Sequence, residues 1–311
     1  MIRLILIGLL AGLFFSSTFI LNRVMSLDGG HWVWSASLRY GYMVLFLLAW
    51  FLLFKGAGEL KSVLRVFLKN WAFWTLAGTV GFGLFYALIC YSADHAPGWV
   101  VATTWQFTII ATLFVLLFFG RTFPRKTWIF SAIVFGGVLM VNLNQAEGAG
   151  LQALLNGVVP VLVAAFCYPL GNQMVWEATN GNRKLPDVSS PVLHTPFARV
   201  LLMSLGSLPL WLILIVATAP PPPSTGQLLN TALVALFSGV AATSLFLQAR
   251  NLSKTAGELA AVDATQSSEV LFALLGEIMI IGAALPDLFS ITGILVTCAG
   301  ISLFVCFQEQ S

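Results

Sequence analysis

Long apolar stretches alternate along the chain with short segments that are polar or rich in Pro and Gly. Each apolar stretch is close to the ~20 residues that an α-helix needs to cross the hydrocarbon core of a bilayer. The pattern therefore predicts ten membrane-spanning helices, near residues 2–21, 32–54, 72–93, 97–119, 127–143, 155–177, 192–217, 228–249, 256–282 and 288–307. The connections between them are short, so we expect no folded domain outside the membrane.

Basic residues gather on alternate connections. If the N-terminus is cytoplasmic, twelve of the 15 Lys and Arg residues fall on the inside, Arg23 falls outside, and Arg39 and Arg199 lie within spans. The inside residues are Arg3, Lys55, Lys61, Arg65, Lys69, Arg121, Arg125, Lys126, Arg183, Lys184, Arg250 and Lys254. Because positively charged loops remain cytoplasmic, this distribution predicts that both termini are cytoplasmic. An error of one helix in the count would destroy the alternation.

The composition agrees with this topology, since 59% of the residues are hydrophobic and only 9% are charged. Soluble domains carry about 25% charged residues, so a soluble protein, a nucleic-acid binder and a disordered chain are excluded. The sequence contains no H-E-x-x-H or C-x-x-C metal motif and no phosphate-binding P-loop. We therefore expect an all-α polytopic membrane protein that uses no metal, no other cofactor and no nucleotide-driven motor.

The two halves of the chain share features in the same order. Each half has an Arg about two turns into its second span (Arg39 and Arg199), a fourth span that opens at a Gly, and a fifth span with a pair of small residues. We interpret residues 1–150 and 151–311 as two five-helix repeats within one integrated transmembrane domain. Because five is an odd number, the second repeat must be inverted. Inverted repeats are typical of secondary transporters, which bind substrate near the membrane midplane.

The predicted helix at 256–282 is unusually polar for a membrane span. Asp263, Gln266 and Glu269 follow at intervals of three residues and therefore lie along one stripe of the helix. Ionisable side chains inside a span are costly and usually functional. We predict that Glu269 binds substrate and, with Asp263, carries a coupling proton, because a desolvated carboxyl group can exchange a proton for a cationic ligand.

Other roles for the charged residues of the spans remain open. Glu269 could instead pair permanently with Arg39, Arg199 or backbone amides and hold helices together. We interpret both arginines as structural, each reaching toward the nearer interface or binding carbonyl groups, with direct binding of an anionic substrate as the alternative. Glu277 lies near the outer end of its helix and is expected to be interfacial.

Further polar and aromatic side chains lie inside predicted spans. Trp105 and Gln106 belong to the fourth span, the repeat partner of the ninth, and a Trp face beside an amide suits a planar or cationic organic ligand. Tyr168 and Asn172 are four residues apart and share a helix face. The complete predicted substrate-binding set is Trp105, Gln106, Tyr86, Tyr168, Asn172, Gln266 and Glu269, and no residue is predicted to be catalytic.

Several stretches are similar to one known family. They are residues 19–23, 34–40, 81–86, 97–99, 104–106, 168–172 and 264–277. On these stretches the chain resembles the ten-helix, EamA-like drug/metabolite transporter superfamily, and within it the bacterial multidrug-resistance efflux transporter family. The resemblance implies a multi-pass exporter of the bacterial cytoplasmic (inner) membrane, with a central cavity lined by helices 1, 3, 4, 6, 8 and 9. The chain departs from the commoner superfamily pattern in lacking a Pro near Glu269 and in having Arg121 where a Glu is usual.

These features favour a secondary active transporter that exports cationic or lipophilic drugs or amino-acid-like metabolites by alternating access. Its predicted partners are the small-molecule substrate, the lipid bilayer and protons as the coupling ion, but no nucleic acid. An uncoupled facilitative exchanger is the alternative within the same class. An intramembrane enzyme would need paired acids, clustered His or a Ser/Lys dyad, and no Lys lies within a predicted span. Both a monomer and a homodimer are compatible with the sequence.

Overall fold

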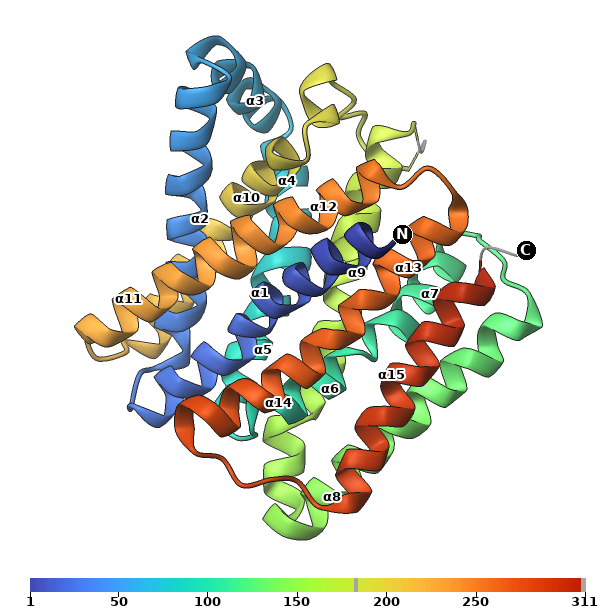
Figure 1. The fold of residues 1–311 in the computed structure, drawn as a ribbon. Helices are drawn as coiled ribbons and strands as arrows, with labels where there is room; N and C mark the ends of the chain where they lie inside the picture. Colours follow the sequence, from blue (N-terminus) through green and yellow to red (C-terminus); the bar gives the residue numbers. More distant parts are fainter. Residues whose placement is uncertain (182–183, 309–311) are drawn as a thin grey trace.

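The fold is known from a computed structural model that describes residues 1–181 and 184–308, without the side chains of residues 145–149, 153, 256, 260 and 306–308. Arg183, one of the basic residues assigned to the inside, lies outside the described residues. The described chain is helical, and its elements run mostly along one direction through the molecule (Figure 1).

Ten described segments are long and apolar enough to cross a membrane, which confirms the predicted number. They are Ile2–Leu27, Trp32–Phe54, Trp71–Ala93, Gly98–Phe118, Arg125–Asn144, Gly150–Thr179, Pro196–Thr218, Thr225–Leu252, Gly257–Ile281 and Leu288–Val305. Their bounds lie close to the predicted ones, because an apolar segment in lipid must bond its backbone groups internally and therefore stays helical along its whole length.

Five spans are built from one helix or part of one, and the others contain a change of helix type or direction. Four of these are the helices α1 (Ile2–Leu27), α2 (Trp32–Phe54), α10 (Pro196–Thr218) and α15 (Leu288–Gln308), and the other is the first part of the long helix α8 (Arg125–Gly157). The last part of α8 begins the sixth span, which continues in α9 (Val159–Thr179). Gly150 separates the two parts, because its φ of 85° is open to glycine and strained for other residues.

The interrupted spans occupy matching places in the two halves. The third span is α4 (Trp71–Gly78), the π-helical η1 (Thr79–Leu84) and α5 (Phe85–Ala93), and the eighth is α11 (Thr225–Val234), the π-helical η3 (Ala235–Ala242) and α12 (Thr243–Leu252). The fourth span is α6 (Gly98–Trp105) and α7 (Thr108–Phe118), and the ninth is α13 (Ala256–Ala264), the 3₁₀ turn η4 (Thr265–Ser267) and α14 (Ser268–Ile281). Such irregular turns inside helices are frequent at functional sites.

One helix between spans was not predicted. The segment Ala57–Lys69 forms the amphipathic helix α3, which buries Leu60 and Val63 and lies at the upper end of the molecule in Figure 1. Glu59 in its first turn and Lys69 in its last turn complement the helix dipole. A search for long apolar runs misses a helix with an apolar stripe on only one side. A second short element, the 3₁₀ turn η2 (Pro191–His194), precedes α10.

Helices from the two halves pack in pairs. The fifth span in α8 lies along α15, the tenth span, at the edge of the molecule in Figure 1. Glycine permits this close approach, since a Cβ atom on Gly300 would come within 2.9 Å of the backbone nitrogen of Val134. The second and seventh spans, α2 and α10, are also neighbours.

The first span of each half packs on the corresponding spans of the other half. The first span, α1, packs on α14 of the ninth span and on η3 of the eighth. Its counterpart in the second half, α9, packs on α6 and α7 of the fourth span and on η1 of the third. Corresponding elements of the two halves therefore have corresponding neighbours.

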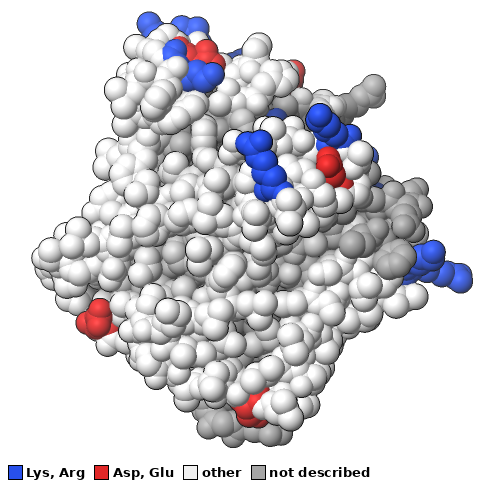
Figure 2. Space-filling view, viewed as in Figure 1, with Lys and Arg blue, Asp and Glu red and all other residues white. Residues whose placement is uncertain are grey.

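Charged side chains are confined to the two ends of the molecule on the face seen in Figure 2. Lys and Arg gather toward the end that carries α3 and the chain termini, whereas only Asp and Glu are visible toward the opposite end. The broad region between them is uncharged, as a surface in contact with hydrocarbon must be.

Candidate functional site

The site is a cavity of about 270 Å³ at the centre of the helix bundle. Helices 1, 3, 4, 6, 8 and 9 contribute to its lining, as the family resemblance implied, and the second and seventh spans contribute as well. The volume is slightly below the ~300–1,000 Å³ of pockets that hold drug-sized ligands. The cavity therefore suits a small solute.

One wall of the cavity is formed where the fourth and ninth spans are interrupted. Gln106 directly follows the last residue of α6, and Glu269 lies in the first turn of α14. The Nε2 atom of Gln106 donates a hydrogen bond of 2.6 Å to Oε1 of Glu269, and the two side chains are only 3% and 8% exposed. The fourth and ninth spans therefore meet through Gln106 and Glu269, one predicted residue from each span. A neutral amide, rather than a cation, is the partner of this carboxyl group.

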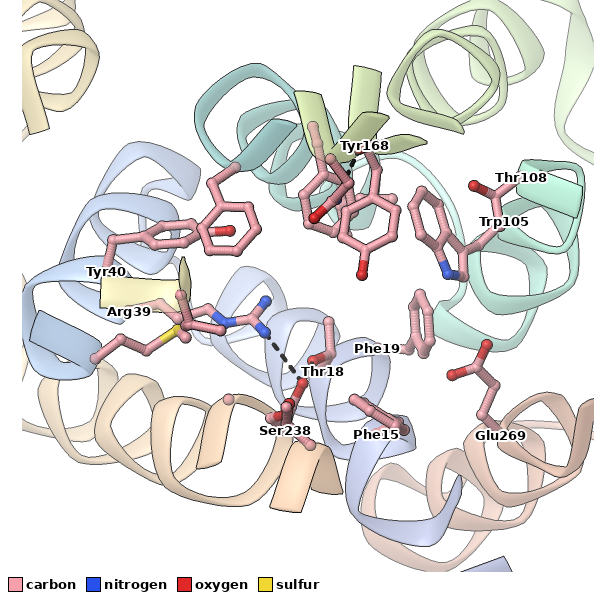
Figure 3. Close-up of a pocket in the computed structure, with 18 of the residues that line it drawn as sticks. Phe15, Thr18, Phe19, Arg39, Tyr40, Trp105, Thr108, Tyr168, Ser238 and Glu269 are labelled. Carbon is pink, nitrogen blue, oxygen red and sulfur yellow. Dashed lines mark hydrogen bonds between the residues drawn. The ribbon is translucent and has the colours of Figure 1, made fainter. Parts of the chain in front are cut away.

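Arg39 of α2 lies on the opposite side of the cavity (Figure 3). Its guanidinium group lies over the ring of Tyr86, with Cζ 3.9 Å from the ring centroid, and Nη2 donates a hydrogen bond of 3.1 Å to Oγ of Ser238. The Ser238 hydroxyl also accepts a hydrogen bond from Thr18. Among the residues that the structure describes, no carboxylate lies within 4.0 Å of Arg39, and its Nε and Nη1 atoms have no hydrogen-bond partner.

The two arginines with matching sequence positions have different environments. Arg199 is exposed, and its Nε atom donates to the backbone oxygen of Leu193 at 2.8 Å, as expected for a structural role. Arg39 is buried and borders the cavity without a described carbonyl partner. In the described part of the chain, neither arginine forms an ion pair with Glu269.

Aromatic rings form a third wall. Phe85, Trp105 and Tyr168 contact one another, with ring centroids 4.9 Å apart for Phe85 and Trp105, 5.1 Å for Phe85 and Tyr168, and 5.6 Å for Trp105 and Tyr168. All three line the cavity, and they come from the third, fourth and sixth spans. The rings provide an apolar surface that also attracts cations.

A proline in the sixth span frees a backbone carbonyl group that contacts the fourth span beside this wall. Pro169 in α9 has no N–H group, so the carbonyl group of Ala165 one turn earlier loses its helical partner. The Thr108 hydroxyl, at the start of α7, donates to that carbonyl oxygen at 3.2 Å. The freed backbone group therefore serves as an inter-helix contact next to the cavity.

The structure brings most of the predicted substrate-binding residues to the cavity. Trp105, Tyr168, Asn172, Gln266 and Glu269 line it directly. Gln106 and Tyr86 lie one layer behind, where Gln106 contacts Glu269 and Tyr86 contacts Arg39. The Tyr86 hydroxyl also accepts a hydrogen bond of 3.0 Å from Asn22.

Two of the acidic residues of the ninth span lie away from the cavity lining. Asp263 forms an ion pair with Arg250 at the end of α12. Glu277, expected at the interface, is instead completely buried, and its carboxylate accepts hydrogen bonds from the backbone nitrogens of Gly98 and Trp99. Glu277 is buried because the free N–H groups at the start of α6 attract a carboxylate.

Several residues that border the cavity were not predicted from the sequence. Phe15, Phe19, Phe85 and Ser238 are of this kind. Nothing in the sequence distinguishes them from the many other Phe and Ser residues of the spans. The position of Arg39 beside the cavity had a signal, since a lone Arg inside an apolar run needs either a partner or a ligand.

Comparison with known proteins agrees with this architecture. The model of the family described as "Putative multidrug resistance efflux transporter" matches residues 2–310. The chain belongs to this family. It is therefore a multi-pass membrane protein of an efflux transporter family, which confirms the resemblance found in the sequence.

Relatives of this efflux transporter family member occur in bacteria. The "Uncharacterized protein YjlA" of Bacillus subtilis (strain 168) is 39% identical over 317 aligned positions, which cover 97% of this chain and 94% of the relative. An "Uncharacterized 42.1 kDa protein in intracellular alkaline protease 3'region" of Shouchella clausii is 36% identical over 280 positions, covering 86% and 70%. One crystal structure superposes with a TM-score of 0.61 over 99% of both chains at 14% identity, which shows a shared fold alone.

Proposed function

We propose that the protein is a secondary active exporter of small organic solutes in the bacterial cytoplasmic membrane, and that it works by alternating access. Residues 1–150 and 151–311 would form inverted repeats that rock against each other around the central cavity. Matching interruptions in spans three and eight and in spans four and nine support this, as do the exchangeable contacts of α1 and α9. Both termini would then be cytoplasmic.

The observation that carries the proposal is the Gln106–Glu269 pair at the cavity wall. Only one carboxyl group borders the cavity among the described residues, and it has an amide partner and no cationic one. Such a carboxyl group can hold a proton in one state and a cationic group of the solute in the other, so that the two compete. Glu269 would couple export to proton entry by this competition.

The groups that face Glu269 are compatible with this exchange. Arg39 and Tyr168 border the same cavity from the second and sixth spans, and Gln106 approaches from the fourth. A permanent ion pair with Arg39 or Arg199 would remove the carboxyl group from such a cycle, and no such pair occurs in the described part of the chain.

The test uses the purified protein in liposomes that contain a pH indicator dye. Methyltriphenylphosphonium, tyramine, leucine and 6-aminohexanoate are added one at a time, and proton movement across the membrane is recorded. We expect at least one probe to drive proton movement with the wild-type protein and none to do so with Glu269→Gln. Asp287→Asn removes an exposed carboxylate outside the spans and should behave as wild type.

Asp263→Asn tests whether the second predicted coupling carboxylate is needed for proton coupling. We expect this variant to retain proton coupling, because Asp263 pairs with Arg250 and lies away from the cavity lining. Probe transport that ignores the pH gradient and survives Glu269→Gln would refute coupling and favour the uncoupled exchanger. Absence of transport for every probe would refute an exporter of this substrate class.

A further inference from the structure

We infer that Arg39 binds an anionic group of the transported solute, and that this solute is an elongated zwitterion whose carboxylate contacts Arg39 while its ammonium group contacts Glu269. The inference rests on the proposed function, because it names the substrate class of the same cavity. It assigns Arg39 a binding role instead of the structural role that the sequence favoured.

Arg39 has hydrogen-bonding capacity that the described residues do not fill. A guanidinium group has five N–H donors arranged to bind a carboxylate through two parallel hydrogen bonds. Arg39 is 8% exposed, and its Nη2 atom donates to a neutral hydroxyl, whereas Nε and Nη1 have no hydrogen-bond partner in the described part of the chain. A buried charge without a counter-ion is strongly destabilising. A carboxylate in the cavity would supply both the charge and the acceptors.

The positive and negative side chains of the cavity lie apart from each other. Figure 3 shows Arg39 and Glu269 on opposite sides of the cavity, with Thr18 and Phe19 of α1 between them. Their hydrogen-bond partners, Ser238 and Gln106, also lie on different helices. A solute that neutralises both residues must therefore carry its two charges at opposite ends. An α-amino acid with a neutral side chain has its ammonium and carboxylate groups bonded to the same carbon atom, so it does not place the two charges at opposite ends.

Aromatic side chains line the cavity between the two charged residues. Phe19 on one side and Trp105 with Tyr168 on the other provide apolar contacts along the cavity. A hydrocarbon segment that joins an ammonium group to a carboxylate can pack against these rings. The cavity volume of about 270 Å³ limits the solute to the size of a small metabolite.

The experiment measures binding to the purified full-length protein in detergent by calorimetry. The probes are 6-aminohexanoate, its isomer norleucine, hexylammonium and hexanoate. They share an unbranched hydrocarbon chain and differ in which charges are present and how far apart the charges lie. We expect the affinity of 6-aminohexanoate to exceed that of each of the other three by about tenfold or more. A single hydrogen bond to a charged group is enough to change a binding constant by that factor.

Variants of Arg39 show whether this residue contacts the carboxylate end of the probe. Arg39→Gln should weaken binding of 6-aminohexanoate by about tenfold or more and leave hexylammonium unchanged. Arg199→Gln is the matched control, because it removes the exposed arginine at the corresponding position of the other half, and should leave all four affinities unchanged. If Arg39→Gln fails to fold, Arg39→Lys keeps the charge without the two-pronged geometry and should weaken 6-aminohexanoate relative to hexylammonium.

The outcomes separate this inference from the proposed function. Equal binding of 6-aminohexanoate to wild type and Arg39→Gln, or tighter binding of norleucine or hexylammonium, would overturn the inference even if protons are coupled to transport. Binding that depends on Arg39, with no proton movement in liposomes, would support the inference and refute the proposed coupling.

Discussion

The buried carboxylate of Glu277 gives a stability prediction that follows from geometry alone. The first turn of α6 has no side-chain cap of its own, because Pro97 precedes it. Glu277 of α14 provides one from another helix, with distances of 2.7 Å to the nitrogen of Gly98 and 3.2 Å to that of Trp99. The contact joins the fourth span to the ninth span, and the interruptions of these two spans form one wall of the cavity.

Replacing Glu277 with Gln keeps the shape of the side chain but removes its charge and one of its two acceptor oxygens. At least one N–H group at the start of α6 then faces an NH₂ group in a site with 0% exposure. Loss of a hydrogen bond to a charged group costs about 1.5–3 kcal/mol. We expect Glu277→Gln to lower the free energy of unfolding by that amount.

The assay is unfolding of the purified protein in mixed micelles with increasing amounts of a denaturing detergent, followed by tryptophan fluorescence. Asp287→Asn is the control, because Asp287 accepts a hydrogen bond of 2.8 Å from the nitrogen of Ser290 near the start of α15 but is exposed. Asn caps a helix about as well as Asp does, so the control should change stability by less than about 0.5 kcal/mol. A Glu277→Gln variant no less stable than Asp287→Asn would refute the reasoning.

Two further predictions test the packing of the halves in the same assay. A Cβ atom on Gly137 would lie 2.6 Å from backbone atoms of α15, whereas one on the adjacent Gly136 would meet nothing within 4 Å. Gly137→Ala should therefore destabilise by about 1–3 kcal/mol, and Gly136→Ala should be neutral or slightly stabilising; equal effects would contradict this packing. Thr108→Val should cost about 1 kcal/mol because it leaves the freed carbonyl group of Ala165 without a donor. Thr112→Val loses only a bond to a carbonyl within its own helix and should cost less; the reverse order would refute the inter-helix role of Thr108.

The sequence by itself determined how many membrane spans the protein has. The number of spans and their approximate bounds follow from the length of the apolar runs, because the hydrocarbon core of the bilayer sets a minimum helix length. The sequence also selected both Glu269 and Gln106, but it offered arginines or backbone amides as partners of Glu269, and the bond between the two side chains came from the structure. The amphipathic helix α3 was missed because its apolar stripe is too narrow to resemble a span.

Only the tertiary structure decided which polar groups share a cavity and which are paired elsewhere. Along the ninth span, Glu269 faces the cavity, Asp263 meets Arg250 and Glu277 caps α6, although all three are acidic residues of one segment. Arg39 and Arg199 occupy matching sequence positions, yet one borders the cavity and the other is exposed. The physical reason is that the energy of a charge in a membrane protein depends on its nearest partners, and those partners lie on helices distant in sequence.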